Sequence, residues 1–178
     1  RPDTKIENKD ALKSNLLSVA CTMAGAANTA PKAKGVNNIE TLILDGEDID
    51  SLVEELLVIH EETGKPFFKR DAQNLVDSPV VLLIGVRFGF RGVPHCGLCG
   101  NVDCATNKER GGICSYDTTD LGIAVGYASA IALDHRVDHR VFFTAGKAAK
   151  RLGLLPDCGI IYALPLSSHG KNIYYDRG

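Results

Sequence analysis

The sequence predicts one domain of the α/β or α+β class, and three observations lead to that prediction. The chain has 178 residues, of which 44% are apolar, so it is long enough and apolar enough to bury one core. Segments typical of helices and strands follow one another in the order α-β-α-α-β-loop-α-α-β, which is a mixed arrangement. We find no internal repeat and no low-complexity linker, so residues 1–178 are expected to form a single domain.

The first half of the chain is expected to supply three helices and one strand. Residues 11–27 are rich in Ala and Leu and predict a helix. Residues 39–46 alternate between apolar and polar side chains and close on Asp-Gly, which is typical of a strand. Residues 47–64 predict an amphipathic helix with Gly64 as its C-cap, and residues 69–77 predict another short helix.

An apolar strand is the central feature of the second half. Residues 79–86 are apolar throughout, which is the pattern of a strand that is covered on both faces. Residues 144–154 predict a short helix, and residues 158–166 predict a further strand.

The helix predicted at residues 118–135 is apolar on nearly every side. Either of the threonines that open it, Thr118 or Thr119, would suit an N-cap. A helix of this composition lies inside a core or a subunit interface. Small residues recur at every fourth position, at Gly122, Gly126 and Ala130. Because this spacing favours close approach of helices, we expect a homodimer.

Four of the six cysteines lie close together in the segment between the apolar strand and this helix. They are Cys96, Cys99, Cys104 and Cys114, with the spacing C-x2-C-x4-C-x9-C. A tight C-x2-C turn with nearby loop cysteines favours an iron–sulfur cluster. Paired zinc knuckles repeat C-x2-C after a spacer, and the second half of this segment lacks that repeat, so zinc is the second reading. Disulfides or an empty thiol site come third. Cys21 and Cys158 lie in apolar settings and are expected in the core.

The string "HCGLCGNVDC" resembles the opening of small four-cysteine [4Fe-4S] domains. Together with "RDAQN", "DLGIAVGYA" and "SSHGKNIYYDR", it makes the whole chain similar to a family of prokaryotic proteins described as containing a ferredoxin domain. This resemblance implies a cluster held by the four cysteines in a cysteine-rich, ferredoxin-like insertion at residues 94–115.

A second resemblance links the chain to nitroreductase-like flavoproteins. It is carried by "ACTMAGAANTAPKAKGVNNIETLIL", "PVVLLIGV", "DLGIAVGYASAIALDHRVDHRVFF" and "AAKRLGLLPDCGIIYALPLS". It implies a nitroreductase-like fold, a homodimer, and an insertion between the central strand and the central helix. It also implies FMN against the loop after the first helix, with Ala30, Pro31, Lys32 and Lys34 as contacts.

The same resemblance raises the question of what holds the FMN phosphate. These flavoproteins usually begin with an Arg-x-Ser-x-Arg-like motif that binds the phosphate. In this chain only Arg1 and Lys5 are available near the N-terminus. Lys171 and Arg177 are the candidates to replace that motif. From the residues alone, exposed lysines beside a helix end either hold a phosphate or are ordinary surface charges.

Other groups of polar residues have both a functional and a structural reading. Residues 134–140, "DHRVDHR", suit a metal or a proton shuttle, but they are more typical of a solvated helix end. His95 next to Cys96 suggests either a further ligand or a loop histidine. Arg70, Asp71 and Asn74 suggest either a ligand pocket or a capping and salt-bridge group.

Composition and motifs also exclude several classes of protein. The net charge of −2 argues against nucleic-acid binding, and no apolar run reaches transmembrane length. Without a visible secretory signal, we expect a cytoplasmic protein that neither binds nor spans a membrane, with reduced thiols. No P-loop and no Gly-x-Ser-x-Gly elbow is present. The leading hypothesis is a redox or electron-transfer protein with an iron–sulfur cluster and FMN. The alternative is a non-catalytic module in which the cysteines hold zinc or brace a loop.

Overall fold

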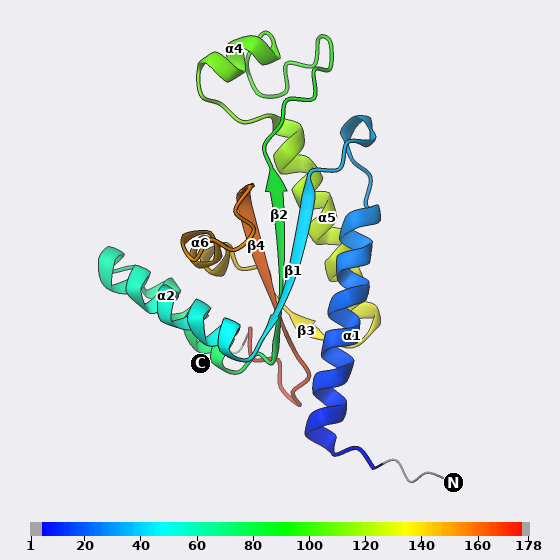
Figure 1. Cartoon of the computed structure of the whole chain (residues 1–178), viewed down its shortest axis with the longest axis vertical. Coiled ribbons are helices and arrows are strands. Elements are labelled where there is room, and N and C mark those ends of the chain that lie inside the picture. Colours follow the sequence, from blue (N-terminus) through cyan, green and yellow to red (C-terminus); the bar gives the residue numbers. More distant parts are fainter. Residues whose placement is uncertain (1–4, 176–178) are drawn as a thin grey trace.

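The computed structural model describes residues 5–175 and shows a four-stranded antiparallel sheet with helices on both faces (Figure 1). The strand order is β1-β2-β4-β3. The strands are β1 (Ile39–Asp45), β2 (Val80–Arg87), β3 (Asp138–His139) and β4 (Cys158–Ser167). The predicted mixed α/β class is therefore confirmed.

Strand β2 lies between β1 and β4, and it is the centre of the core. Its residues Val80 to Val86 are buried, as expected from the apolar run. Neighbouring side chains point to opposite faces, so Leu82 packs in one hydrophobic cluster and Leu83 in the other. An all-antiparallel sheet can leave one face in water, but here helices cover both faces.

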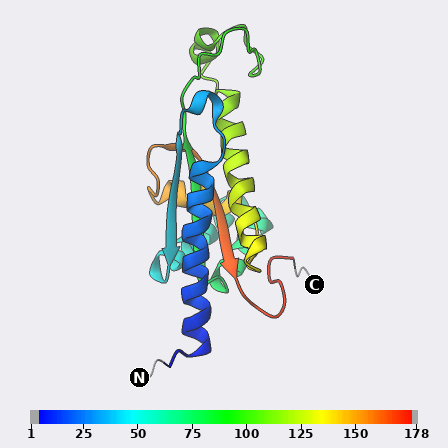
Figure 2. The ribbon, with the colours of Figure 1, turned by 90° about the vertical axis from the view of Figure 1, so that its right-hand side faces the viewer.

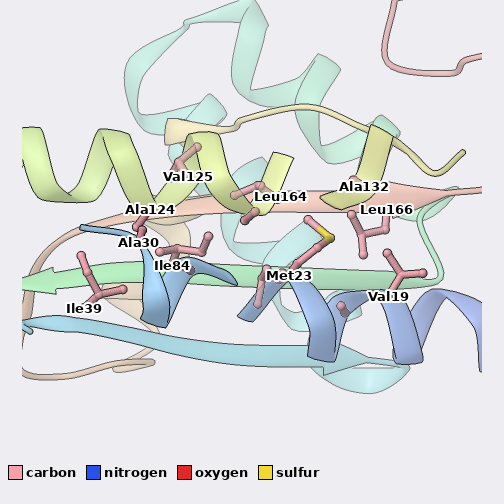
Figure 3. Packing of buried hydrophobic residues seen from close by; sticks show 14 of the residues in the cluster. Val19, Met23, Ala30, Ile39, Ile84, Ala124, Val125, Ala132, Leu164 and Leu166 are labelled. Carbon is pink, nitrogen blue, oxygen red and sulfur yellow. The ribbon is translucent and has the colours of Figure 1, made fainter. Parts of the chain in front are cut away.

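Two long helices cover one face of the sheet. They are α1 (Asn8–Thr29) and α5 (Ser115–Asp134), which run side by side along the strands (Figure 2). Figure 3 shows Met23 of α1, Ala124 and Ala132 of α5 and Ile84 of β2 in the hydrophobic cluster between the layers. Small residues on α5 let the two helices pack closely on the sheet.

Three shorter helices cover the other face. They are α2 (Glu47–Thr63), α3 (Pro66–Val76) and α6 (Phe143–Arg151). Gly64 follows α2 with φ 64° and ψ 12°, the left-handed conformation of a C-cap, so that prediction is confirmed. The apolar stripe of α2 consists of Ile49, Leu52, Leu56 and Ile59.

The start of α5 differs from the prediction of an N-cap at Thr118 or Thr119. The helix begins at Ser115 with Cys114 at the N-cap, and both threonine hydroxyls donate to the Ser115 carbonyl at 2.9 Å. The extra turn forms because Asp117 within it is buried against Arg91, and this contact fixes the first turn.

Cys21 was expected in the core, and this prediction is wrong. Its thiol is exposed, whereas Cys158 is buried as predicted. The buried stripe of α1 runs through Leu16, Val19, Ala20, Met23 and Ala27. Since successive helical residues are about 100° apart, Cys21 falls on the outer side of that stripe.

The cysteine-rich segment leaves β2 at Arg87 and returns at the start of α5. It contains one short helix, α4 (Cys104–Glu109), and stands beyond the end of the sheet (Figure 1). The loop after α1, with a 3₁₀ turn at Ala33–Gly35, lies at the same end of the molecule (Figure 2). Within residues 5–175, no helix is long and apolar enough to cross a membrane.

Candidate redox site

Three of the four clustered cysteines line one cavity. Cys96, Cys99 and Cys104 surround a hollow of about 300 Å³, together with His95 and Asn101. All three are free thiols that are half-buried. Cys104 is the first residue of α4, which Asp103 caps by accepting a hydrogen bond from the Thr106 amide at 2.8 Å. That bond also lowers the pKa of the Asp103 carboxyl.

The backbone of this loop turns on residues with positive φ. Gly97 and Gly100, which flank Cys99, have φ values of 55° and 77°. Glycine adopts this conformation at little cost, so the two turns direct the C-x2-C pair toward the same hollow. His95 also has a positive φ of 55°, although its side chain is exposed. The loop geometry therefore follows from the glycines that the sequence supplies.

Cys114 lies apart from the other three. It is 7% exposed, at the N-cap of α5, and is not among the residues that line the hollow. Within residues 5–175, no three His, Cys, Asp or Glu side chains are close enough together to hold a metal ion. The donor set nevertheless fits a thiolate-bound metal in its chemistry, because three free thiols face one hollow and the fourth borders the same loop.

A buried charge cluster lies directly beneath the cysteine loop. Arg91 Nη1 is 3.0 Å from Asp117 Oδ1, and Arg91 Nη2 is 3.2 Å from Asp120 Oδ2. The three side chains are at most 4% exposed. The Gly89 amide donates to Asp117 Oδ2 at 2.8 Å. This hydrogen bond joins the residues directly after β2 to the first turn of α5, so it ties together the two ends of the cysteine loop. Breaking such a cluster on one side leaves an unpaired buried charge.

Burial in this cluster affects the Asp117 carboxyl. Burial raises the pKa of the Asp117 carboxyl, although the Gly89 amide and Arg91 act in the opposite direction. Arg91 Nε is buried and has no hydrogen-bond partner among the described residues. The cluster is therefore satisfied only in part.

The same cluster connects the cysteine loop with the loop after α1. Asp120 Oδ1 accepts a hydrogen bond from the Ala33 amide at 3.1 Å, and Lys34 Nζ donates to the Arg91 carbonyl at 3.1 Å. Two segments far apart in the sequence, the predicted flavin loop and the stem of the cysteine loop, are thus joined through the first turns of α5.

The lysines of the predicted flavin loop have partners within the chain. Lys32 Nζ donates to the carbonyls of Ala27 and Asn28 at 2.8 and 2.9 Å, and so it caps the end of α1. Burial lowers the pKa of Lys32. As placed, the ammonium groups of Lys32 and Lys34 donate to main-chain carbonyls of the chain itself.

The other predicted flavin contacts are not gathered at one point. Ala30 is buried against the sheet, and Pro31 is exposed beside it. Lys171 is exposed on the segment after β4. Arg1 and Arg177 lie outside the described residues.

Several of the remaining polar groups contact neighbouring elements of the fold. The buried Asp71 carboxylate accepts hydrogen bonds from Arg70 Nε at 2.8 Å and from Thr144 Oγ1 at 2.6 Å, and so it ties α3 to α6. In the segment 134–140, Asp138 and His139 pair with β4 as strand β3. Burial lowers the pKa of His139.

The fold is similar to that of nitroreductase-like proteins. A nitroreductase-like family protein from Bacillus cereus aligns with a TM-score of 0.58 and 12% identity, covering 96% of this chain and 79% of that one. A nitroreductase with bound FMN from Desulfitobacterium hafniense aligns with a TM-score of 0.59 and 11% identity, covering 94% of this chain and 81% of that one. At these identities the likeness shows the fold.

Sequence comparison gives the family. An uncharacterized protein from Archaeoglobus fulgidus is 34% identical over an alignment of 181 positions, which covers 97% of this chain and 97% of that one. Residues 110–177 match the family described as "Uncharacterized protein containing a ferredoxin domain (DUF2148)". The chain belongs to this family, as its motifs indicated.

Sequence reasoning found the cysteines but missed the charge cluster. Arg91, Asp117 and Asp120 were not singled out as site residues. A signal was present, because Asp117 and Asp120 are three residues apart at the start of an otherwise apolar helix. Carboxylates on the buried side of such a helix require a cation, and Arg91, Lys108 and Arg110 of the preceding loop are the candidates along the chain.

Proposed function

We propose that the protein transfers electrons through an iron–sulfur cluster, of the [4Fe-4S] type, held by Cys96, Cys99, Cys104 and Cys114. The observation that carries this proposal is the set of three free thiols around one hollow. The family description, which includes a ferredoxin domain, supports it. Such a cluster supplies one-electron transfer, while the protein supplies its position and its surroundings.

The position of the loop suits exchange of electrons with a partner. The loop stands beyond the end of the sheet (Figure 1), and its apolar side chains are exposed, with Leu98 at 64% and Val102 at 81%. Apolar residues around an exposed redox centre favour short-lived docking. The thiol hollow is on this exposed loop, so a partner can approach it without opening the core.

FMN is the second cofactor of the proposal, at the loop Ala30–Gly35. The fold and the FMN bound in a protein of the same fold support it. The FMN phosphate needs cations beside this loop, and the candidates from the sequence are Lys32, Lys34, Lys171 and Arg177. We assign no chemical step to this loop.

A homodimer through α1 and α5 completes the proposal. Gly122 and Gly126 are exposed, and a Cβ atom added at either position would meet nothing within 4 Å. Tyr127 and Leu133, on the same helix, are 47% and 66% exposed. An apolar surface of this kind favours burial against a second copy.

Metal analysis of anaerobically purified protein tests the cluster. We expect about four iron and four sulfide per chain. Cys99→Ser should abolish this content, whereas Cys21→Ser, which removes an exposed thiol outside the loop, should leave it unchanged. Stoichiometric zinc without iron would contradict the cluster proposal and support the alternative, a non-catalytic module in which the cysteines hold zinc.

Titration of the protein with FMN tests the flavin separately. Quenching of flavin fluorescence that saturates in the micromolar range supports the site. Lys34→Ala should weaken this binding more than Lys147→Ala, since Lys147 is exposed on α6 on the opposite face of the sheet. Absence of quenching at high micromolar FMN removes flavin from the function and leaves the cluster proposal intact.

A further inference from the structure

One side chain in the cysteine loop is buried although its neighbours are exposed. Asn107 is 2% exposed, and it is the one buried residue of α4. A carboxamide that is removed from water needs hydrogen-bond partners, because an unpaired polar group is costly. Its partners show what it holds together.

The Asn107 carboxamide connects the two parts of the cysteine set. Its Nδ2 donates to the Ile113 carbonyl at 3.0 Å, directly before Cys114. Its Oδ1 accepts a hydrogen bond from Asn101 Nδ2 at 3.1 Å. A continuous path of polar contacts therefore runs from Asn101 to the residue that precedes Cys114.

Asn101 extends this path to a thiol. Its Nδ2 lies 3.8 Å from Cys99 Sγ and 3.4 Å from the Cys99 carbonyl. Arg110 Nη1 donates to Asn101 Oδ1 at 3.0 Å, which fixes the orientation of the amide so that its NH₂ group faces Cys99. An N–H group directed at a ligand sulfur stabilises the thiolate form that binds metal.

The backbone around Asn107 is adapted to the same contact. Gly112 donates its amide to the Asn107 carbonyl at 2.9 Å. A Cβ atom at Gly112 would lie 1.9 Å from Asn107 Oδ1, far inside van der Waals contact. Gly112 does not have a positive φ, so the need for glycine here comes from the Asn107 side chain.

We propose that Asn107 is a positioning residue of the cysteine site. Its side chain fixes the position of Cys114 relative to the hollow that Cys96, Cys99 and Cys104 line. The proposal rests on the proposed function, in that the four cysteines bind metal together. It adds that the site is assembled by a pair of carboxamides, Asn101 and Asn107, and that Gly112 is required to admit the second of them.

Zinc affinity of reduced, metal-free protein tests the proposal, with Zn²⁺ alone as the probe and a competing chelator as the reference. Asn107→Ala should weaken binding by about 10–100-fold, the usual effect of removing a group that orients a ligand. Gly112→Ala should have a similar effect, because it displaces the Asn107 side chain. Asn28→Ala is the matched control, since Asn28 belongs to an exposed Asn–Asn pair outside the loop.

The double variant Asn107→Ala/Gly112→Ala makes the test specific. Without the carboxamide the close contact with Gly112 is gone, so the second substitution should add little to the first. Additive losses would overturn the pairing of Asn107 with Gly112. Unchanged zinc affinity in Asn107→Ala, with wild-type protein binding well, would overturn the positioning role.

A metal-free measurement separates this inference from the proposed function. In the wild type Cys114 is buried, so its alkylation should be slow, and Asn107→Ala should accelerate it without changing the rate at exposed Cys21. No acceleration would contradict the inference. Wild-type protein that binds neither zinc nor iron, while Asn107→Ala still exposes Cys114, would refute the metal function and retain the positioning role.

Discussion

The two faces of the sheet are covered by helices of different kinds. On the face covered by α2, α3 and α6, charged side chains point outward, and Arg151 pairs with both Glu55 and Glu62 at 2.6 Å. On the face covered by α1 and α5, the outer side of α5 is still apolar or small, with Leu133 66% exposed. The first face carries ion pairs beside exposed apolar residues such as Val76. On the second face, Tyr127 and Leu133 lie on the same helix as exposed glycines, which is a surface that suits a second copy.

The elements of the candidate site lie on the side of α1 and α5. The cysteine loop, the loop after α1 and the buried charge cluster all adjoin α1 and α5. The α2, α3 and α6 face contributes stability through apolar packing. The predictions below separate these two contributions, from the largest expected effect to the smallest.

Arg91→Met should be the most destabilising substitution, because it leaves the Asp117 and Asp120 carboxylates buried without a cation. We expect a loss of about 3–5 kcal/mol in the free energy of unfolding, measured by urea denaturation. Arg87→Met is the control, since Arg87 and Glu40 form a partly exposed pair that is worth at most about 1 kcal/mol. Equal losses in the two variants would show that the cluster is not a stability determinant.

Leu83→Ala tests the packing of the face covered by α2, α3 and α6. Leu83 is fully buried against α2, α3 and α6, so its truncation should cost about 2–5 kcal/mol. Leu57→Ala on the exposed side of α2 should change stability by less than about 0.5 kcal/mol. A small loss for Leu83→Ala, measured in the same denaturant series, would mean that this core is loosely packed.

Leu133→Asp tests the face that presents an apolar outer surface. Because Leu133 is exposed in the single chain, the substitution should leave the fold intact but dissociate a dimer through α5. Sedimentation velocity at micromolar concentration should show a dimer for the wild type and a monomer for Leu133→Asp. Leu57→Asp, at an exposed leucine on the other face, should remain dimeric. A monomeric wild type would reject this interface.

The smallest effect on stability is expected at the exposed thiol of α1. Cys21→Ser should change the free energy of unfolding by less than about 0.5 kcal/mol. Cys21 should also react readily with iodoacetamide, whereas Cys158 should not. Burial raises the pKa of Cys158 to about 11, so its thiol remains protonated at about pH 8. Mass spectrometry of the alkylated protein measures the labelling of Cys21 and of Cys158. Rapid labelling of Cys158 would contradict its burial.

Periodicity in the sequence predicted most of the fold because apolar spacing records burial directly. The continuous run of β2 and the stripe of α2 each appear in the structure as expected. Cys21 was misplaced because an apolar residue on an Ala-rich helix does not reveal which side is buried. The start of α5 was misplaced because threonines are good N-caps in isolation, and the buried Asp117 outweighs them.

The site was predictable only where chemistry is concentrated in a short segment. Four cysteines within residues 96–114 were visible at once. The charge cluster was not, because Arg91 and Asp120 are joined only after β2 and α5 pack together. The role of Asn107 was hidden for a similar reason, since an asparagine on a short helix is ordinarily a surface residue.

The contact between Gly89 and Asp117 has an evolutionary consequence. It holds the two ends of the cysteine loop together, so the packing of the sheet and its helices does not depend on how many residues the loop contains. The entropy of closing such a loop grows only slowly with its length. A lineage could therefore extend, shorten or replace residues 92–113 without rebuilding the scaffold, and new redox chemistry could be acquired at this position by exchange of a single segment.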